Sequence, residues 1–176
     1  MKCNIDSKQA QLIAQDIQLL LLDVDGVLTD GHLYYSNSGE EMKTFSTLDG
    51  HGIKMLQENG IRVGIITGRS SQLLVNRARE LGIEILLQGQ TNKIDALQQI
   101  LQQTDASPQA VAYAGDDFPD LQVMRSVGLG ISVANGHPDI IASADLVTSR
   151  RGGDGAVREI TDFLLKAQDK YSAYLK

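Results

Sequence analysis

The chain has 176 residues, of which 42% are hydrophobic and 22% charged. This length suits one compact domain over residues 1–176 and leaves no room for a second domain of enzyme size. Asp and Glu (22) outnumber Lys and Arg (16), which gives a formal net charge of −6. An acidic protein repels nucleic-acid phosphates and anionic membrane surfaces, so we expect neither as a partner. A phosphorylated metabolite would be repelled too, unless a metal ion or a local basic patch reverses the field.

The sequence shows no signal for export or for a membrane. No apolar run approaches the roughly 18 residues of a membrane span, and residues 1–17 lack the apolar stretch of a secretory signal. The single cysteine, Cys3, cannot form an internal disulfide and is expected to be a cytosolic thiol. We therefore expect a cytoplasmic protein.

From Leu19 onward, short apolar runs alternate with amphipathic stretches. The runs, which we predict to be strands, cover residues 19–24, 61–67, 83–87, 110–114 and 129–133. The stretches, which we predict to be helices, cover residues 50–58, 71–81, 91–103, 118–126 and 156–168. Runs that are apolar on both faces are typical of parallel strands. The alternation therefore predicts an α/β fold with a doubly wound, Rossmann-like parallel sheet, preceded by an N-terminal segment over 1–17.

One segment, residues 31–45, breaks the alternation. Two β-prone pieces, 32–35 and 42–45, flank the turn-rich sequence SNSG. This pattern predicts a projecting β-hairpin whose turn is longer than the tight two-residue type. The hairpin would stand beside the carboxyl end of the first strand, where open α/β sheets bind ligands. Sheet, helices and hairpin use up the chain, so we expect no cap domain over this edge.

Polar side chains follow four successive predicted strands. Asp23 and Asp25 follow the first strand, Thr67 ends the second, Lys93 follows the third and the pair 116–117 follows the fourth. An isolated Asp-x-Asp is usually a polar strand end. Here several carboxylates converge on one sheet edge, where uncompensated negative charge is costly. A hard cation with oxygen ligands resolves this, so we expect Mg²⁺ rather than a soft metal.

With Mg²⁺ at this edge, the polar groups suit phosphoryl transfer. Asp23 would attack phosphorus and form an aspartyl-phosphate, and Asp25 would protonate the leaving alcohol and then activate water. Thr67, Lys93 and the backbone N–H groups near Gly68 would bind the phosphoryl oxygens.

These motifs resemble those of the haloacid dehalogenase superfamily of phosphatases: DVDGV, IITG, a lone Lys93 and GDDxxD, in this order. Longer stretches, among them LLLLDVDGVLTDG, GIITGRSS, AYAGDDFPDL and RGGDGAVREI, are similar to a capless branch that acts on an eight-carbon phosphorylated sugar acid. The resemblance implies a Mg²⁺-dependent phosphatase that works as a homotetramer in lipopolysaccharide sugar synthesis. Its partners would be a small phosphorylated sugar acid and further copies of itself.

The resemblance also implies roles for the acidic residues. Asp23 is identified as nucleophile and metal ligand, and Asp25 as the acid/base, with its main-chain carbonyl also on the metal. Asp116 is identified as the other direct metal ligand. Asp117 would support the metal, directly or through water, and Asp120 adds to the charge of this edge.

For the substrate, the resemblance implies that Thr67, Gly68 and Lys93 bind phosphate. It implies that Arg69 binds the carboxylate of the sugar acid, for which an arginine fork is suited. Two positions depart from the family pattern: Leu48 and Asp154 stand where the family commonly has basic residues. These departures leave the sugar specificity open. Arg150 and Arg151 are close enough in sequence to substitute for the missing cations.

Three alternatives remain at this stage. One is a phosphatase for another acidic sugar, such as a nine-carbon ulosonate 9-phosphate. The second is a phospho-acceptor signalling domain, which also combines an acidic pair, Thr and Lys around Mg²⁺. Such a domain carries its phosphorylated Asp after the third strand, where this chain has LQGQ. The third is a binding homologue that has lost catalysis, against which the four intact motifs argue. We further expect the hairpin, and the C-terminal YSAYLK, to cover a neighbouring subunit's site.

Overall fold

The computed structural model describes residues 1–175, but not the side chains of Glu40 and Glu41. Within this range the central sheet contains seven strands: β1 (Lys2–Cys3), β2 (Leu19–Leu22), β5 (Arg62–Ile66), β6 (Ile85–Leu87), β7 (Val111–Gly115), β8 (Leu129–Ser132) and β9 (Leu146–Val147). Their order is β1-β9-β8-β7-β2-β5-β6, and every pair is parallel except β1 with β9.

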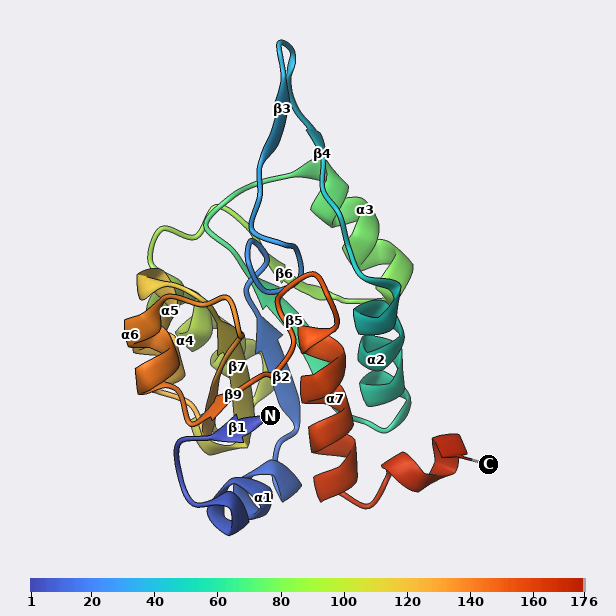
Figure 1. The fold of residues 1–176 in the computed structure, drawn as a ribbon, viewed down its shortest axis with the longest axis vertical. Helices are drawn as coiled ribbons and strands as arrows, with labels where there is room; N and C mark the ends of the chain where they lie inside the picture. The colour runs from blue at the N-terminus through green and yellow to red at the C-terminus, as the bar shows by residue number, and fades with distance from the viewer. Residues whose placement is uncertain (176) are drawn as a thin grey trace.

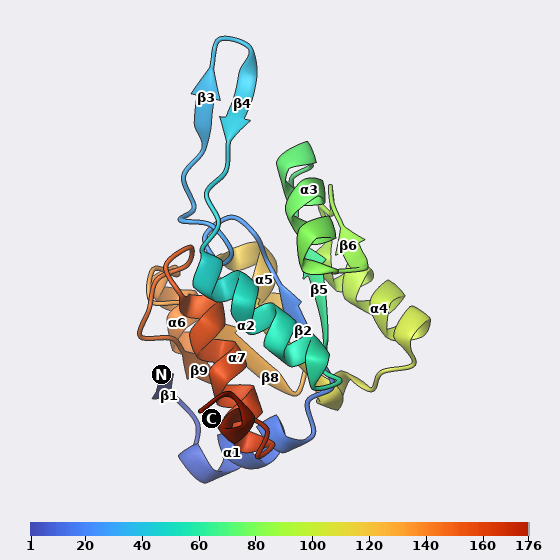
Figure 2. The same cartoon turned by 90° about the vertical axis from the view of Figure 1, so that its right-hand side faces the viewer.

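Helices cover both faces of the sheet (Figures 1 and 2). The α-helices of the described chain are α1 (Ser7–Gln15), α2 (Thr47–Glu58), α3 (Gln72–Leu81), α4 (Lys93–Thr104), α5 (Phe118–Met124), α6 (Pro138–Ser143) and α7 (Ala156–Ala167). One core cluster lies under α1, α2, α3 and α7, and the other under α4, α5 and α6. The prediction of a doubly wound α/β fold with a mainly parallel sheet is confirmed.

The strand β2 lies at the centre because it can bury both faces. Leu20 and Leu22 belong to the core cluster beneath α2 and α7, whereas Leu19 and Leu21 belong to the opposite one. Period-two alternation sends successive side chains to opposite faces, so a run of four leucines satisfies both cores. The neighbours of β2 are β5 and β7, both parallel to it. The loops that follow these three strands therefore emerge side by side at one edge.

Several elements were not predicted from the sequence. β1 and β9 have two residues each and α6 has six, which is too short for a periodic pattern. Helix α1 is longer, and it begins after Asp6, whose carboxylate accepts hydrogen bonds from the backbone of Lys8 and Gln9 (3.0 Å each). Helix α2 begins at Thr47 rather than at residue 50, because the Ser46 hydroxyl caps its first turn.

A hairpin formed by β3 (Tyr34–Ser36) and β4 (Gly39–Met42) projects from the carboxyl edge of the sheet (Figures 1 and 2). Its position agrees with the prediction, but the predicted long turn is wrong. Ser36 pairs with Gly39, which leaves a two-residue turn. Gly39 has a φ of +123°, a conformation open to glycine, and this allows the chain to reverse so tightly. Within residues 1–175, no cap domain covers the edge beside the hairpin.

The chain ends in a short 3₁₀ segment, η2 (Tyr171–Leu175), which folds back on its own α2. There the Tyr174 hydroxyl lies 3.0 Å from a carboxylate oxygen of Glu58 and accepts from the side chain of Asn59 (2.8 Å). The last residue of YSAYLK, Lys176, lies outside the described residues. Among the helices of residues 1–175, none combines the length and apolar character needed to cross a membrane.

Candidate active site

The first site residue follows β2 at the middle of the sheet. The Asp23 N–H donates to the carbonyl of Ala114 (3.0 Å), so the β2–β7 ladder fixes its backbone. The Asp23 side chain is largely buried, and one of its oxygens lies 2.8 Å from Nζ of Lys93. The chain then turns at Gly26, which has a φ of +96°. Asp23 is thus presented at the rim of the sheet beside a fixed cation.

Lys93 is the first residue of α4. The side chain of Asn92 caps this helix by accepting from the N–H of Ile94 (3.3 Å). The Lys93 ammonium is buried between Asp23 and Asp120, with Asp120 Oδ1 at 2.7 Å. Burial opposes its charge, but the two carboxylates together raise the pKa of Lys93. Lys93 therefore stays protonated and has a fixed position.

Asp120 is fully buried, and both of its carboxylate oxygens are in use. Oδ1 accepts from Lys93 and from the hydroxyl of Tyr113 (2.6 Å). Oδ2 accepts from the N–H groups of Asp116 (3.0 Å) and Asp117 (3.2 Å). A carboxylate has about four lone-pair sites, and four donors already use them. Asp120 therefore orients the loop after β7 and Lys93, and is less suited than its neighbours to hold a cation.

The carboxylates of Asp23, Asp116 and Asp120 form an acidic cluster around the ammonium group of Lys93. Burial, and then the charge of Asp120, raise the pKa of Asp23 to about 6. Burial, and then the charge of Asp23, raise the pKa of Asp116 to about 7. One oxygen from each of Asp23, Asp116 and Asp120 lies within 4.8 Å of the others. Because the oxygens of Asp120 already accept four hydrogen bonds, Asp23 and Asp116 are the carboxylates that fit a hard divalent cation, which would favour their ionised forms.

Gly26 leaves Asp116 the space that it occupies. A Cβ built on Gly26 would overlap Oδ2 of Asp116, and the positive φ of Gly26 independently disfavours any other residue. The glycine of the DVDGV motif therefore lets the loops after β2 and β7 approach closely enough for their carboxylates to converge.

The Asp25 carboxylate faces two cations. Lys43 Nζ forms an ion pair with Oδ1 of Asp25, and Nε of Arg69 lies 3.7 Å from Oδ2. The side chain of Lys43 is only 2% exposed, although it comes from the segment that returns from the hairpin. Arg69 also donates to the hydroxyl of Tyr35 (2.6 Å) on the hairpin. Sequence reasoning missed Lys43 and Tyr35, since the hairpin pattern does not indicate which side chains turn toward the sheet edge.

Thr67 directly follows β5, which pairs with β2 on the side opposite to β7. Its N–H donates to Leu87 (3.0 Å) and its buried hydroxyl accepts from the N–H of Arg69 (3.4 Å). Asp117 caps α5, because its side chain accepts from the N–H of Phe118 (2.8 Å).

All the predicted site residues line one open pocket of about 550 Å³. The predicted members are Asp23, Asp25, Thr67, Gly68, Arg69, Lys93, Asp116, Asp117 and Asp120. The structure adds Gly31, Gln90, Thr91 and Pro119. Residues from four strand ends thus converge, as expected from their positions in a parallel sheet.

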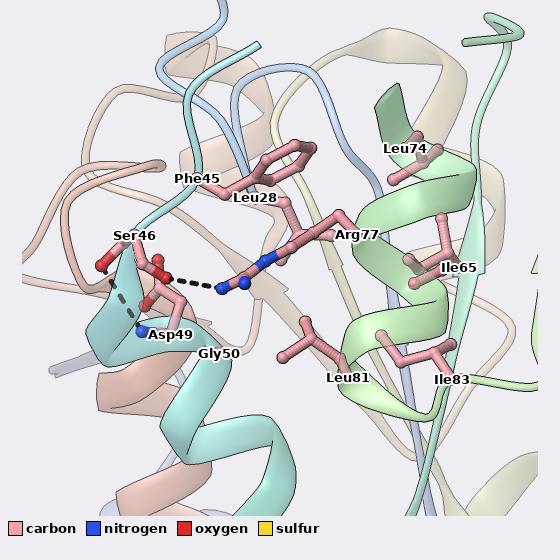
Figure 3. Close-up of a pocket in the computed structure, with 11 residues that line it drawn as sticks. Leu28, Phe45, Ser46, Asp49, Gly50, Ile65, Leu74, Arg77, Leu81 and Ile83 are labelled. Atoms are coloured by element: carbon pink, nitrogen blue, oxygen red, sulfur yellow. Dashed lines mark hydrogen bonds between the residues drawn. The ribbon is translucent and has the colours of Figure 1, made fainter. Parts of the chain in front are cut away.

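A second, smaller cavity lies between α2 and α3 (Figure 3). Arg77 crosses it, donating to the carbonyl of Ser46 (3.4 Å), with its guanidinium 5.9 Å from the ring centroid of Phe45. Asp49, at its polar end, accepts from the N–H of Arg158 (2.7 Å) and so ties α2 to α7. Leu48 is 48% exposed. These polar groups serve packing between helices, and we assign no reaction to this cavity.

Comparison with known proteins agrees with this site. Residues 83–160 match the family model of haloacid dehalogenase-like hydrolases. The chain is 50% identical over 157 residues to the 3-deoxy-D-manno-octulosonate 8-phosphate phosphatase of Escherichia coli (strain K12), covering 89% of this chain and 84% of that protein. The counterpart from Yersinia pestis is 49% identical over the same shares of both chains.

Solved structures give the same result. A 3-deoxy-D-manno-octulosonate 8-phosphate phosphatase from Moraxella catarrhalis, in complex with a magnesium ion, a phosphate ion and a KDO molecule, superposes with a TM-score of 0.94. It is 42% identical, and the match covers 97% of this chain and 98% of that one. The Yersinia pestis enzyme superposes with a TM-score of 0.92 at 47% identity, covering 93% and 89%.

The chain thus belongs to the haloacid dehalogenase-like hydrolases and, within them, to the family of the 3-deoxy-D-manno-octulosonate 8-phosphate phosphatases. The resemblance in the sequence motifs is confirmed.

Proposed function

We propose that this protein is a Mg²⁺-dependent phosphatase that hydrolyses 3-deoxy-D-manno-octulosonate 8-phosphate to the free sugar acid and inorganic phosphate, in lipopolysaccharide biosynthesis. The observation that carries this proposal is the convergence of Asp23, Asp25, Lys93 and Asp116 in one pocket. The 50% identity to the Escherichia coli enzyme and the magnesium, phosphate and KDO in the Moraxella catarrhalis structure support the substrate and the metal.

The residues around the pocket suggest where the cation is held. Asp23, Asp116 and the main-chain carbonyl of Asp25 would bind Mg²⁺, with Asp117 in a supporting position. When bound, the ion neutralises charge on the phosphoryl group during transfer. Lys93 and Thr67 would bind phosphoryl oxygens from the protein side, with Gly68 contributing backbone contact.

The reaction would proceed in two displacements. In the first, a carboxylate oxygen of Asp23 forms a bond to phosphorus while the bond from phosphorus to the sugar oxygen breaks. Asp25 gives its proton to that oxygen, so the sugar leaves as an alcohol. In the second, Asp25 takes a proton from a water molecule whose oxygen attacks phosphorus, and the Asp23–phosphorus bond breaks. The products are inorganic phosphate and the original carboxylate.

Arg69 is the proposed partner of the substrate carboxylate. Its guanidinium lies at the pocket, exposed, and donates to Tyr35. The carboxylate of the sugar acid would accept two parallel hydrogen bonds from the Arg69 guanidinium. A single hydroxyl oxygen cannot form this two-oxygen contact. Tyr35 would then hold Arg69 in place before the substrate arrives.

We also propose a homotetramer in the cytoplasm. The hairpin supports self-association, because it projects from the sheet edge (Figure 2) and its apolar side chains Leu33, Tyr34, Tyr35 and Met42 are 40–59% exposed. Exposed apolar groups gathered in this way are typical of protein interfaces. Light scattering at micromolar concentration tests the assembly, and a monomer would contradict it. Fractionation of cells tests the compartment.

A nine-carbon ulosonate 9-phosphate is the second candidate substrate, since Leu48 and Asp154 replace the basic residues common in the family. Phosphate release from the two substrates, with and without Mg²⁺, distinguishes them. We expect a higher kcat/KM for the eight-carbon substrate and no turnover without the metal. Equal or inverted preference would contradict the proposed substrate.

A further inference from the structure

The peptide between Asp25 and Gly26 is hydrogen-bonded to a buried side chain, that of Thr29. We propose that Thr29 is a positioning residue: its hydroxyl orients the Asp25–Gly26 peptide and thereby sets the affinity for Mg²⁺. The inference rests on the proposed function, in which the Asp25 carbonyl is one of the metal ligands.

The hydroxyl of Thr29 connects three points of the loop after β2. The side chain is 1% exposed. Its Oγ1 accepts from the N–H groups of Gly26 (3.4 Å) and Gly31 (3.2 Å), and donates to the carbonyl of Val24 (3.3 Å). One buried oxygen therefore contacts both ends and the middle of residues 24–31.

The bond to Gly26 fixes the direction of the neighbouring carbonyl. The described chain has no cis peptide bond, so the peptide between Asp25 and Gly26 is trans. In a trans peptide the N–H and C=O groups point in opposite directions. Because the Gly26 N–H points to Thr29, the Asp25 carbonyl points away from it. Directed away from Thr29, this oxygen would be a suitable ligand for a hard cation.

The next peptide is anchored independently. Nδ2 of Asn135 donates to the Gly26 carbonyl (3.1 Å), while its Oδ1 accepts from the N–H of Gly152 (2.6 Å). The Gly153 N–H donates to the carbonyl of Val27 (3.1 Å). Loss of the Thr29 hydroxyl would thus leave the path of the loop in place and free mainly the Asp25–Gly26 peptide to rotate. Groups that orient metal ligands typically contribute about 10–100-fold to metal affinity.

Calorimetric titration of the full chain with MgCl₂ tests this inference, using Thr29→Val, Thr29→Ser and the wild type. Valine keeps the shape and removes the hydroxyl, whereas serine keeps the hydroxyl. We expect the Kd for Mg²⁺ to rise about tenfold or more in Thr29→Val and to stay within about threefold in Thr29→Ser. Thr161→Val is the matched control, because Thr161 is also fully buried but donates within α7 to Arg158 (2.9 Å). Its Kd should match the wild type.

A Thr29→Val protein that is folded and binds Mg²⁺ as tightly as the wild type would overturn the inference, as would equal weakening in Thr161→Val. If Thr29→Val does not fold, Thr29→Cys replaces it, since a thiol is a weak acceptor of similar size. Its Kd should then rise above that of Thr29→Ser, and an unchanged Kd would overturn the inference. Failure of the proposed function looks different: the wild type itself would neither bind Mg²⁺ nor release phosphate.

Discussion

Nζ of Lys93 lies between two carboxylates, 2.8 Å from Asp23 and 2.7 Å from Asp120. The ammonium group of Lys93 therefore contacts the proposed nucleophile, Asp23. It is held in position by Asp120, which has no part in the proposed reaction. Asp120 is held in turn by Tyr113 and by the backbone of the loop after β7. This arrangement makes Lys93 a preorganised cation, which is effective where negative charge develops during phosphoryl transfer.

We expect Lys93→Met to reduce kcat by about 100-fold or more, because one preorganised donor contributes about this much to transition-state stabilisation. Lys54→Met is the control, since Lys54 is exposed on α2, and it should leave kcat unchanged. Steady-state phosphate release measures both variants. A Lys93→Met enzyme with wild-type kcat would show that this ammonium does not stabilise the reaction.

Gly26→Ala should abolish Mg²⁺ binding and lower phosphate release by about 100-fold or more, because the new methyl group would displace Asp116. The control is Gly60→Ala: Gly60 also has a positive φ (+79°), but a Cβ there meets no atom within 4 Å. Both variants should lose on the order of 1–2 kcal/mol of stability from backbone strain. Only Gly26→Ala should lose the metal, and retained Mg²⁺ affinity in calorimetry would refute the argument.

The metal-free protein should lose stability as the pH rises from about 4 to 8. Asp23 and Asp116 have pKa values of about 6 and 7 in the folded protein, against 3.8 for the ordinary carboxyl group. Between these values the folded state retains protons that the unfolded state has released. Their contribution to stability is therefore complete below pH 4 and is lost as the pH passes 6 to 7.

Urea unfolding in EDTA at pH 5 and pH 8 measures this loss. For Asp116→Asn, which lacks one of the two acids, we expect a smaller decrease, by on the order of 1 kcal/mol. Saturating Mg²⁺ should remove the decrease in the wild type, because the cation favours the ionised acids. An identical pH dependence in the variant would mean that Asp116 ionises normally in the folded protein.

Lys43→Met should impair the proton transfer assigned to Asp25, since it removes the buried cation that fixes this carboxylate. Proton transfer contributes about 100-fold or more when the leaving group is an alcohol, so we expect kcat on the sugar phosphate to fall by about tenfold or more. Turnover of p-nitrophenyl phosphate, whose leaving group needs little protonation, should fall much less. Lys43→Arg should recover part of the loss. Equal loss on both substrates would indicate a general structural effect instead.

The fold and the pocket were predictable because both follow from short-range features. Four leucines in a row favour a strand with two buried faces, and parallel strands place Asp23, Thr67 and Asp116 at one edge. The role of Asp120 could not be predicted from such features. Its place in GDDxxD predicts proximity to the site, but only the structure shows that four donors occupy its oxygens.

Contacts between segments that lie far apart in the chain could not be predicted from the sequence. Lys43 reaches Asp25 only because the hairpin turns within two residues and returns its second arm across the sheet edge. The register of a hairpin decides which side chains face inward, and a change of one residue reverses them. Asn135, which joins Gly26 to Gly152, was likewise unpredictable, because the three residues meet only after three separate loops pack together.

The most direct test of the central claim is phosphate release from 3-deoxy-D-manno-octulosonate 8-phosphate by the wild type and by Asp23→Asn, each with and without Mg²⁺. We predict turnover by the Mg²⁺-loaded wild type alone, since an amide at position 23 cannot form the aspartyl-phosphate. A folded Asp23→Asn protein with wild-type turnover would contradict it.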